Sequence, residues 1–489
     1  MDGIAAESST GLDIDKDVRK RRSIKDICFG GESWTHYHLS VFMLTFFSYA
    51  LFHCSRKTFS NVKSTIQAEW LPPDEKNKDA LVDKKVWDPN HHAFTDPDEA
   101  EAFLGVLDGV FLGAYAVGLY ISGFLGDRYE PRLVLSIGMW LSGIACFLFG
   151  CLSEWLEIYS PAYYVVFWLV SGLIQSSGWP TEVAVMGSWF GHGSRGFVLG
   201  LWSACASIGN IMGAFIVSSV VDYGYEYGFL VCASLLVAGG FVVFFGLVSA
   251  PRDVGLPDPE ESSGLAEDQR PQPIGFVRAL LLPGVISYCL AYACLKLVNY
   301  SFFFWLPYYL NVEFGWSQAE ADDLSTWYDW GGIVGGFLGG ILSDHLATRT
   351  PVIVSMLVLA MGALFGYSRS PKQRFWNGLL MSIAGFFVGG PANLISAAVA
   401  ADLGRQPDIR GDAEALGTVT GLVDGTGSVG AAIGQVLLPK VEIWLGWRAV
   451  FYMFIVMTLI TTCCILPILV KDIRDWLRRR RTVDISESA

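Results

Sequence analysis

Long apolar runs alternate with shorter polar stretches along most of the chain, a pattern typical of a polytopic helical membrane protein. A helix that crosses a bilayer needs about 20 mostly apolar residues. Hydropathy predicts about twelve such helices, with approximate limits at 37–60, 102–126, 132–152, 161–186, 196–220, 227–250, 281–310, 324–344, 351–367, 376–402, 414–438 and 446–470. The predicted fold class is therefore all-α membrane, with twelve transmembrane helices.

A polar stretch rich in Pro, Glu, Asp and Ser, from 251 to 273, separates six spans from six. Such a segment cannot bury a core of its own. The expected organisation is an N-terminal tail (1–36), a six-helix bundle (37–250, with a long loop at 61–100), a linker (251–280), a second six-helix bundle (281–470) and a C-terminal tail (471–489).

Lys and Arg residues in the short loops predict how the chain is oriented. Loops on one side contain most of them, at 19–22, 128–132, 195, 349, 405–410 and 478–481. Loops on the other side, at 153–161, 219–228 and 311–323, contain none, although the loop 367–375 carries three. Because basic residues stay on the cytosolic side, both termini are predicted to be cytosolic, and the loop 61–100 luminal.

Composition supports the membrane class and excludes others. The 489 residues are 52% hydrophobic, include 53 glycines and have a mean hydropathy of +0.41. The net charge of −13 is concentrated outside the apolar runs, which argues against nucleic acid as a partner. The ten cysteines form no motif with metal-ligand spacing, so no metal site is expected. No other cofactor is expected either, and the chain is predicted to be a transporter rather than an enzyme.

Four motifs of the first half recur in the second half, in the same order and at offsets near 211–221. The Asp127 motif after the second span corresponds to Asp344 after the eighth, and Pro180 corresponds to Pro391. The pair Gly209 and Gly213 matches Gly430 and Gly434, and Asp108 matches Asp329. This regularity indicates duplication, and hence two pseudo-symmetric six-helix bundles that enclose a site near the membrane midplane.

The repeated charged motifs after the second and eighth spans suit a gate whose ion pairs break as the halves separate. Its predicted members are Asp127, Arg128, Arg132, Asp344 and Arg349. A simple solvated turn is the alternative interpretation of Asp127. The recurrence of the motif in both halves favours the gate.

The first span carries two cations into the membrane. The apolar run from Leu39 to Cys54 supplies only 16 residues. A spanning helix of about 20 residues therefore continues past Cys54 and carries Arg56 and Lys57 into the membrane. A buried guanidinium costs at least about 2.5 kcal/mol on insertion scales and usually faces an aqueous cavity. One interpretation is that Arg56 reaches the headgroups and ends the helix. The favoured one is that Arg56 binds an anion in a transport pathway.

The second half offers Lys296 in the middle of the seventh span, with Asn299 and Tyr300 on the same helix face. On the first span, Tyr49 and His53 lie on the face of Arg56, although His53 could equally be a core histidine. Lys57 points about 100° away from Arg56. The predicted substrate-binding residues are Arg56, Lys296, Tyr49, His53, Lys57 and Asn299.

Several motifs resemble the sugar-phosphate exchanger family of solute carriers, organophosphate:phosphate antiporters of the major facilitator superfamily. They are Ser55-Arg-Lys-Thr-Phe-Ser60, Gly178-Trp-Pro180, Trp189-Phe-Gly191, Ala400-Ala-Asp-Leu-Gly404 and Val423-Asp-Gly-Thr-Gly-Ser428. The resemblance implies antiport of a sugar phosphate against inorganic phosphate by rocker-switch alternating access. It suggests the endoplasmic reticulum membrane, with the lysosomal membrane as the alternative.

The resemblance also assigns roles to single positions. Arg56 matches the family's phosphate-binding arginine, and Tyr49 matches a tyrosine of the bacterial site. The second phosphate-binding arginine of the bacterial transporters falls at Asn299, their span-two lysine at Leu119 and their span-five histidine at Ala206. The cavity of this chain is therefore expected to carry less positive charge than theirs.

Two other functions stay open on the residues alone. One is a proton-coupled carrier of another organic anion, with Asp108, Asp329 and Asp424 as the titrating groups. The other is a non-transporting membrane scaffold, which would gain nothing from a buried arginine. The sequence also leaves open whether an accessory membrane subunit takes part.

Overall fold

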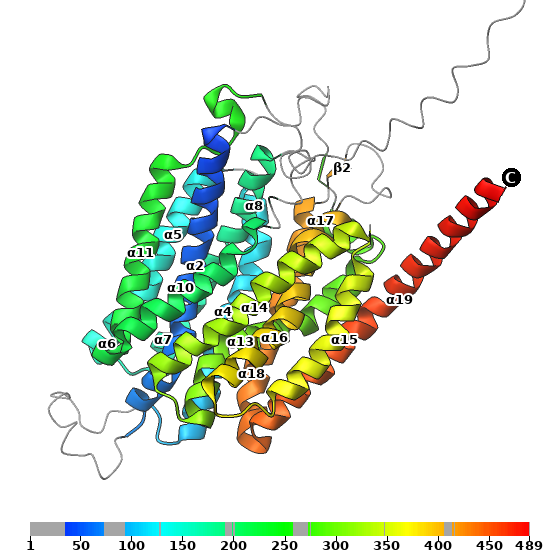
Figure 1. Cartoon of the computed structure of the whole chain (residues 1–489). Coiled ribbons are helices and arrows are strands. Elements are labelled where there is room, and N and C mark those ends of the chain that lie inside the picture. Colours follow the sequence, from blue (N-terminus) through cyan, green and yellow to red (C-terminus); the bar gives the residue numbers. More distant parts are fainter. Residues whose placement is uncertain are drawn as a thin grey trace, which may run out of the picture.

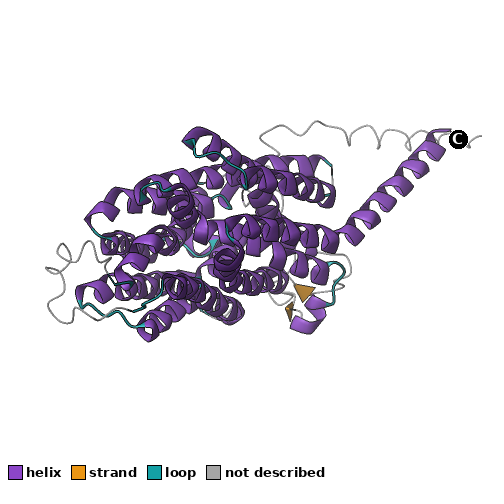
Figure 2. Cartoon of the chain, turned by 90° about the horizontal axis from the view of Figure 1, so that it is seen from below, coloured by secondary structure: helices purple, strands orange, loops and turns teal. Residues whose placement is uncertain are grey.

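The computed structural model describes residues 35–72, 93–126, 129–190, 198, 201–257, 272–273, 275–346, 348–404, 413–414 and 416–488. This part of the chain is almost entirely helical (Figures 1 and 2). The N-terminal tail before residue 35, most of the loop 61–100 and the centre of the linker lie outside the described residues.

The helices fall into two halves that lie side by side in Figure 1. The N half consists of α2 (His36–Trp70), α4 (Pro97–Gly126), α5 (Pro131–Phe147), η3 (Leu148–Leu152), α6 (Ser153–Trp155), α7 (Pro161–Gln175), α8 (Gly178–Trp189), α10 (Cys205–Val220), η4 (Val221–Tyr223) and α11 (Tyr225–Gly246). The C half consists of α13 (Val285–Phe314), α14 (Gln318–His345), α15 (Thr350–Tyr367), α16 (Arg374–Asn393), η8 (Leu394–Val399), α17 (Ala400–Leu403), α18 (Leu416–Leu445) and α19 (Trp447–Ser488).

The linker that joins the two halves along the chain contains three short elements. The linker contributes η5 (Pro251–Val254), β1 (Gln272–Pro273) and α12 (Phe276–Leu280). The two residues of β1 pair in parallel with β2 (Ala413–Glu414), so the end of the linker contacts the segment that precedes α18.

Ten helices in the described part are long and apolar enough to cross a membrane. The remaining two positions of the predicted twelve are occupied by α7 with α8, which are separated by a turn at Ser176 and Ser177, and by α14. The strand-free core and these helices confirm the all-α membrane fold. The chain is a multi-pass membrane protein.

Helix packing repeats from one half to the other. In the N half α2 packs on α10, α4 on α7, and α5 on α11. In the C half α13 packs on α18, α14 on α16, and α15 on α19. These pairs occupy equivalent places in chain order, so the internal repeat seen in the sequence corresponds to two bundles with the same internal arrangement.

Matching glycines allow the closest of these contacts. A Cβ added at Gly209 would lie 2.2 Å from the carbonyl oxygen of Ala50 on α2. A Cβ at Gly430 would lie 2.3 Å from the carbonyl oxygen of Ala293 on α13. Because backbone blocks both positions, α10 and α18 approach their partners only where the side chain is a hydrogen atom.

Gly209→Ala and Gly430→Ala are therefore expected to destabilise the protein by about 1–3 kcal/mol each, through overpacking. The measurement is the thermal unfolding temperature of purified protein in detergent. Gly362→Ala is the control, because nothing lies within 4 Å of a Cβ at that position of α15. Equal unfolding temperatures for all three variants would contradict the packing described here.

Several hydrogen bonds join the two halves at one end of the molecule. We call this the Trp70 end, because α2 ends there, and call the opposite end the His36 end. The hydroxyl of Ser60 donates to the carbonyl of Phe303 over 2.7 Å, and the Tyr308 hydroxyl lies 3.0 Å from Gln67 Oε1 and from Glu101 Oε2. Ser64 also bonds Gln318. These contacts close the space between the halves at the Trp70 end.

Two helices extend beyond their predicted limits. The first span was expected to end at 60, whereas α2 continues to Trp70. The last was expected to end at 470, whereas α19 continues to Ser488 and stands away from the body of the molecule (Figures 1 and 2). In α2 the extra turns bury polar residues against the C half, which hydropathy cannot distinguish from a loop.

Candidate functional site

A cavity lies between the two halves and encloses about 930 Å³ of space, part of it open to solvent. The N half contributes residues of α2, α4, α8 and α10, and the C half contributes residues of α13, α14, α16, η8 and α18. Four of the six predicted binding residues line it: Tyr49, His53, Lys57 and Asn299.

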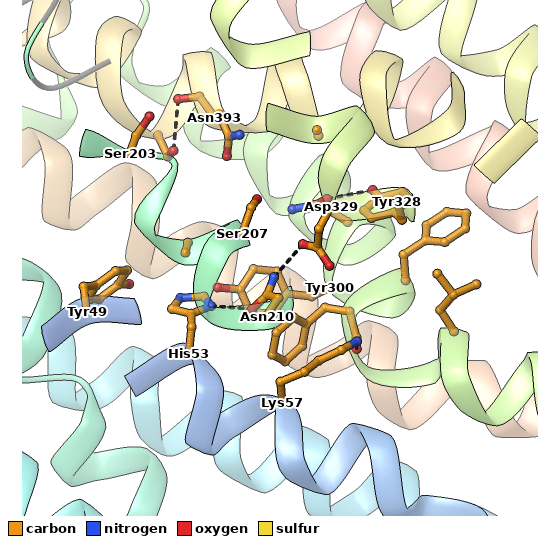
Figure 3. A pocket seen from close by; sticks show the side chains of 18 of the residues that line it. Tyr49, His53, Lys57, Ser203, Ser207, Asn210, Tyr300, Tyr328, Asp329 and Asn393 are labelled. Atoms are coloured by element: carbon orange, nitrogen blue, oxygen red, sulfur yellow. Dashed lines mark hydrogen bonds between the residues drawn. The ribbon is translucent and has the colours of Figure 1, made fainter. Parts of the chain in front are cut away.

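A chain of hydrogen bonds crosses the cavity from one half to the other (Figure 3). His53 Nδ1 lies 3.0 Å from Asn210 Oδ1, and Asn210 Nδ2 donates to Asp329 Oδ1 over 2.7 Å. On the far wall, the Tyr328 hydroxyl donates to Asn299 Oδ1 over 2.7 Å. His53 is therefore part of the cavity wall, rather than a core histidine remote from the site.

Arg56 lies behind the cavity wall, wholly buried within the N half. Its Cζ is 4.7 Å from the ring centre of Tyr115, a residue that lines the cavity, and 5.4 Å from that of Phe111. Nε donates to Gln175 Oε1 over 3.3 Å, whereas Nη1 and Nη2 have no hydrogen-bond partner among the described residues. The side chain does not extend toward headgroups, so the interpretation of Arg56 as a helix-ending interfacial residue is wrong.

The free donors of Arg56 matter because a buried charged group without partners is energetically costly. Aromatic faces on one side offset part of this cost. A planar guanidinium with two unpaired nitrogens is suited to bind two oxygens of a phosphoryl group.

Lys57 lies on the cavity wall and contacts the C half. Its Nζ donates to the carbonyl of Phe303 over 2.5 Å and to Ser60 Oγ over 3.3 Å, and lies 4.9 Å from the Phe303 ring centre. Lys57 thus joins α2 to α13 at the Trp70 side of the cavity.

Lys296 is held by its own half of the molecule. Its Nζ lies 2.8 Å from Asp424 Oδ1 and 2.8 Å from Ser428 Oγ, both on α18. Asp424 lines the cavity and Lys296 lies behind it. The positive charge predicted for the second wall is therefore paired with a carboxylate, which leaves Arg56 as the buried cation with unpaired donors among the described residues.

The predicted gate lies at the His36 end and is described only in part. Asp127 and Arg128 lie outside the described residues, and the side chain of Asp344 is not described. Arg132 lies 2.9 Å from Glu130, and Arg349 Nε lies 2.5 Å from Asp402 Oδ2. The first pair lies within the N half and the second within the C half. A gate between the halves stays a prediction.

Sequence reasoning missed two features of this region. Asn210 and Tyr328 were not proposed as site residues, although a polar amide within an apolar span is itself a signal of function. Lys63, which was placed in the loop, forms an ion pair with Asp108, and both side chains are fully buried. Lys63 Nζ also lies 3.8 Å from the ring centre of Trp305 in the C half.

Comparison with known proteins agrees with this architecture. The model of the Major Facilitator Superfamily matches residues 45–434 and 289–483. Among solved structures, the chain resembles a D-xylose-proton symporter with a TM-score of 0.62 at 12% identity, covering 88% of this chain and 97% of that one. It resembles a bacterial homologue of the human lysosomal transporter Spinster, in an inward-facing and unoccupied conformation, with a TM-score of 0.60 at 15% identity, covering 90% and 96%. These distant likenesses show the fold alone.

Closer relatives are known by sequence. Sugar phosphate exchanger 3 of Xenopus laevis is 53% identical over 480 residues, which cover 92% of this chain and 95% of that protein. The protein of the same name from Homo sapiens is 52% identical, with 92% and 96% covered. The glucose-6-phosphate exchanger SLC37A2 of Mus musculus is 36% identical, with 92% and 95% covered. The chain therefore belongs to the sugar-phosphate exchanger family of solute carriers, transporters of the major facilitator superfamily.

Proposed function

We propose that this protein exchanges a sugar phosphate for inorganic phosphate across an intracellular membrane. The observation that carries the proposal is the buried guanidinium of Arg56, whose Nη1 and Nη2 have no partner among the described residues and which adjoins a cavity between two homologous bundles. Relatives named for sugar phosphates and for glucose 6-phosphate support the same substrate class.

Exchange is the expected mode because of the charge of the empty site. A buried cation without its anion is costly, and moving it between the two sides of the membrane without a ligand is costly too. Phosphate on the return path would satisfy the same donors. We therefore expect obligate antiport, because the site is costly to reorient without an anion. The two homologous halves would rock around the cavity to expose it to each side in turn.

The direction in which the cavity opens follows from the proposed topology. If both termini are cytosolic, as the basic loops favour, the Trp70 end is luminal. The contacts at that end would then close the luminal side, and the structure would correspond to an inward-facing or nearly occluded state. We propose the endoplasmic reticulum as the compartment, with the lysosome as the alternative.

Counterflow into proteoliposomes tests the function. Radiolabelled phosphate is expected to enter vesicles that contain unlabelled phosphate or glucose 6-phosphate, and not vesicles that contain only buffer. Uptake into buffer-loaded vesicles that follows an imposed pH gradient would instead identify a proton-coupled carrier. Absence of uptake under both conditions would refute transport of phosphate.

A further inference from the structure

Of the aspartates that the sequence places within spans, Asp329 differs from the other two. Asp108 forms an ion pair with Lys63, and Asp424 forms one with Lys296. Asp329 lines the cavity and forms no ion pair among the described residues. Its described hydrogen-bond partner is a neutral amide, Asn210 Nδ2, at 2.7 Å, and the cation whose charge acts on it is Lys57 of α2.

The surroundings of Asp329 are polar but are not matched to an anion. Asn299 and Asn393 line the same side of the cavity, from α13 and α16. Because Asn299 Oδ1 accepts from the Tyr328 hydroxyl, its Nδ2 remains as the donor group of that side chain. This wall therefore combines a carboxylate acceptor with amide donors, a set that fits hydroxyl groups, which both donate and accept.

The opposite wall has the other chemistry. Arg56 and Lys57 both lie on α2, and no carboxylate pairs with either one among the described residues. A phosphoryl group is attracted to this side and repelled by the carboxylate of Asp329. The cavity thus adjoins two cations of α2, of which Lys57 also contacts Phe303 of the C half, and it has a hydroxyl-accepting wall on α13, α14 and α16. Figure 3 shows Lys57 and Asp329 among the residues that line it.

We propose that Asp329 selects the substrate by accepting hydrogen bonds from the hydroxyl groups of its sugar, while the phosphoryl group lies toward the N half. This inference rests on the proposed exchange of sugar phosphates. The hydroxyls replace Asn210 Nδ2, which is oriented toward Asp329 because His53 Nδ1 holds the other end of the amide. A site built to bind a hydroxyl group discriminates strongly against ligands that lack it, because its own polar groups are then left unpaired.

The test uses the full chain in proteoliposomes that exchange radiolabelled phosphate for trapped phosphate. Glucose 6-phosphate and ethyl phosphate, which has no hydroxyl on its carbon chain, are compared as competitors. In the unmodified protein, glucose 6-phosphate should compete more strongly by about 10-fold or more. Asp329→Asn should remove most of this advantage, measured as the ratio of the two inhibition constants, whatever the change in the rate of phosphate exchange itself.

Asp323→Asn is the matched control, because it removes the same charge from an exposed position of the same helix. It should leave the preference for glucose 6-phosphate unchanged. An unchanged preference in Asp329→Asn would overturn the proposal. So would a loss of response to an imposed pH gradient in that variant with its preference intact, since Asp329 would then carry a proton.

Two further outcomes separate this inference from the proposed function. Folding of Asp329→Asn is judged by its elution in size-exclusion chromatography and by its thermal unfolding. If the variant does not fold, the competition measured with the unmodified protein tests the proposal. Equal competition by ethyl phosphate and glucose 6-phosphate would then refute recognition of the hydroxyls. If the unmodified protein exchanges no phosphate at all, the proposed function fails, and the role of Asp329 fails with it.

Discussion

Arg56→Gln is expected to lower phosphate exchange by at least about 30-fold, while the protein stays folded. Removing one partner of a buried, hydrogen-bonded charge pair typically costs 2–5 kcal/mol, and each 1.4 kcal/mol is a factor of ten in affinity. In the proposed complex, Arg56 Nη1 and Nη2 bind the phosphoryl oxygens, and glutamine can supply neither the charge nor the fork. The measurement is counterflow of radiolabelled phosphate in proteoliposomes.

The thermal stability of Arg56→Gln should not fall with its activity. Because Nη1 and Nη2 have no partners in the described residues, the substitution removes an unpaired buried charge from the ligand-free protein. Its thermal unfolding temperature should therefore be unchanged or higher, and the stabilisation that added phosphate gives the unmodified protein should be lost.

Two controls limit the interpretation. Arg56→Lys keeps a charge without the planar fork and should retain part of the exchange. Arg369→Gln removes an exposed arginine outside the cavity and should leave the exchange rate unchanged. Exchange at the normal rate in Arg56→Gln would refute the assignment of the phosphate-binding group.

The fold could be predicted because its information is local and repeated. Spanning helices are visible as apolar runs, and the Gly209 and Gly430 motifs match at a constant offset. Each of these glycines lies where a helix touches its partner's backbone, at Ala50 and Ala293. The predicted cavity face of α2 appears only in part: Tyr49 and His53 line the cavity, whereas Arg56 lies behind its wall and Lys57, expected to point away from Arg56, lines it.

What could not be predicted depends on contacts between distant parts of the chain. Lys296 was expected to offer a free charge, but Asp424 pairs with it from 128 residues further along. Asn210 joins the two walls only because α10 and α14 meet across the cavity. A single sequence gives the polar residue but not its partner, and the partner decides whether the charge is available to a ligand.

The same reason explains why Lys63 was assigned to a loop. Asn61, Lys63 and Gln67 end the apolar pattern of the first span, yet α2 continues through them. Hydropathy measures suitability for lipid, whereas these side chains face protein. Lys63 is fully buried between Asp108 and the ring of Trp305.

Lys63→Met is therefore expected to destabilise the protein by about 3–5 kcal/mol, because it leaves the carboxylate of Asp108 buried without its cation. Asp108 Oδ1 has no hydrogen-bond partner among the described residues even in the intact pair, so little else holds the charge. The measurement is the thermal unfolding temperature in detergent, supported by chemical denaturation.

The double variant Lys63→Met with Asp108→Leu separates the charge from the packing. Replacing a buried ion pair with apolar residues of similar volume is often neutral, so the double variant should recover most of the stability that Lys63→Met loses. Arg374→Met, which breaks an exposed pair with Glu320, should leave the unfolding temperature unchanged. A single variant as stable as the unmodified protein would mean that Asp108 is already uncharged, and that the pair does not join α2 to α4 through its charges.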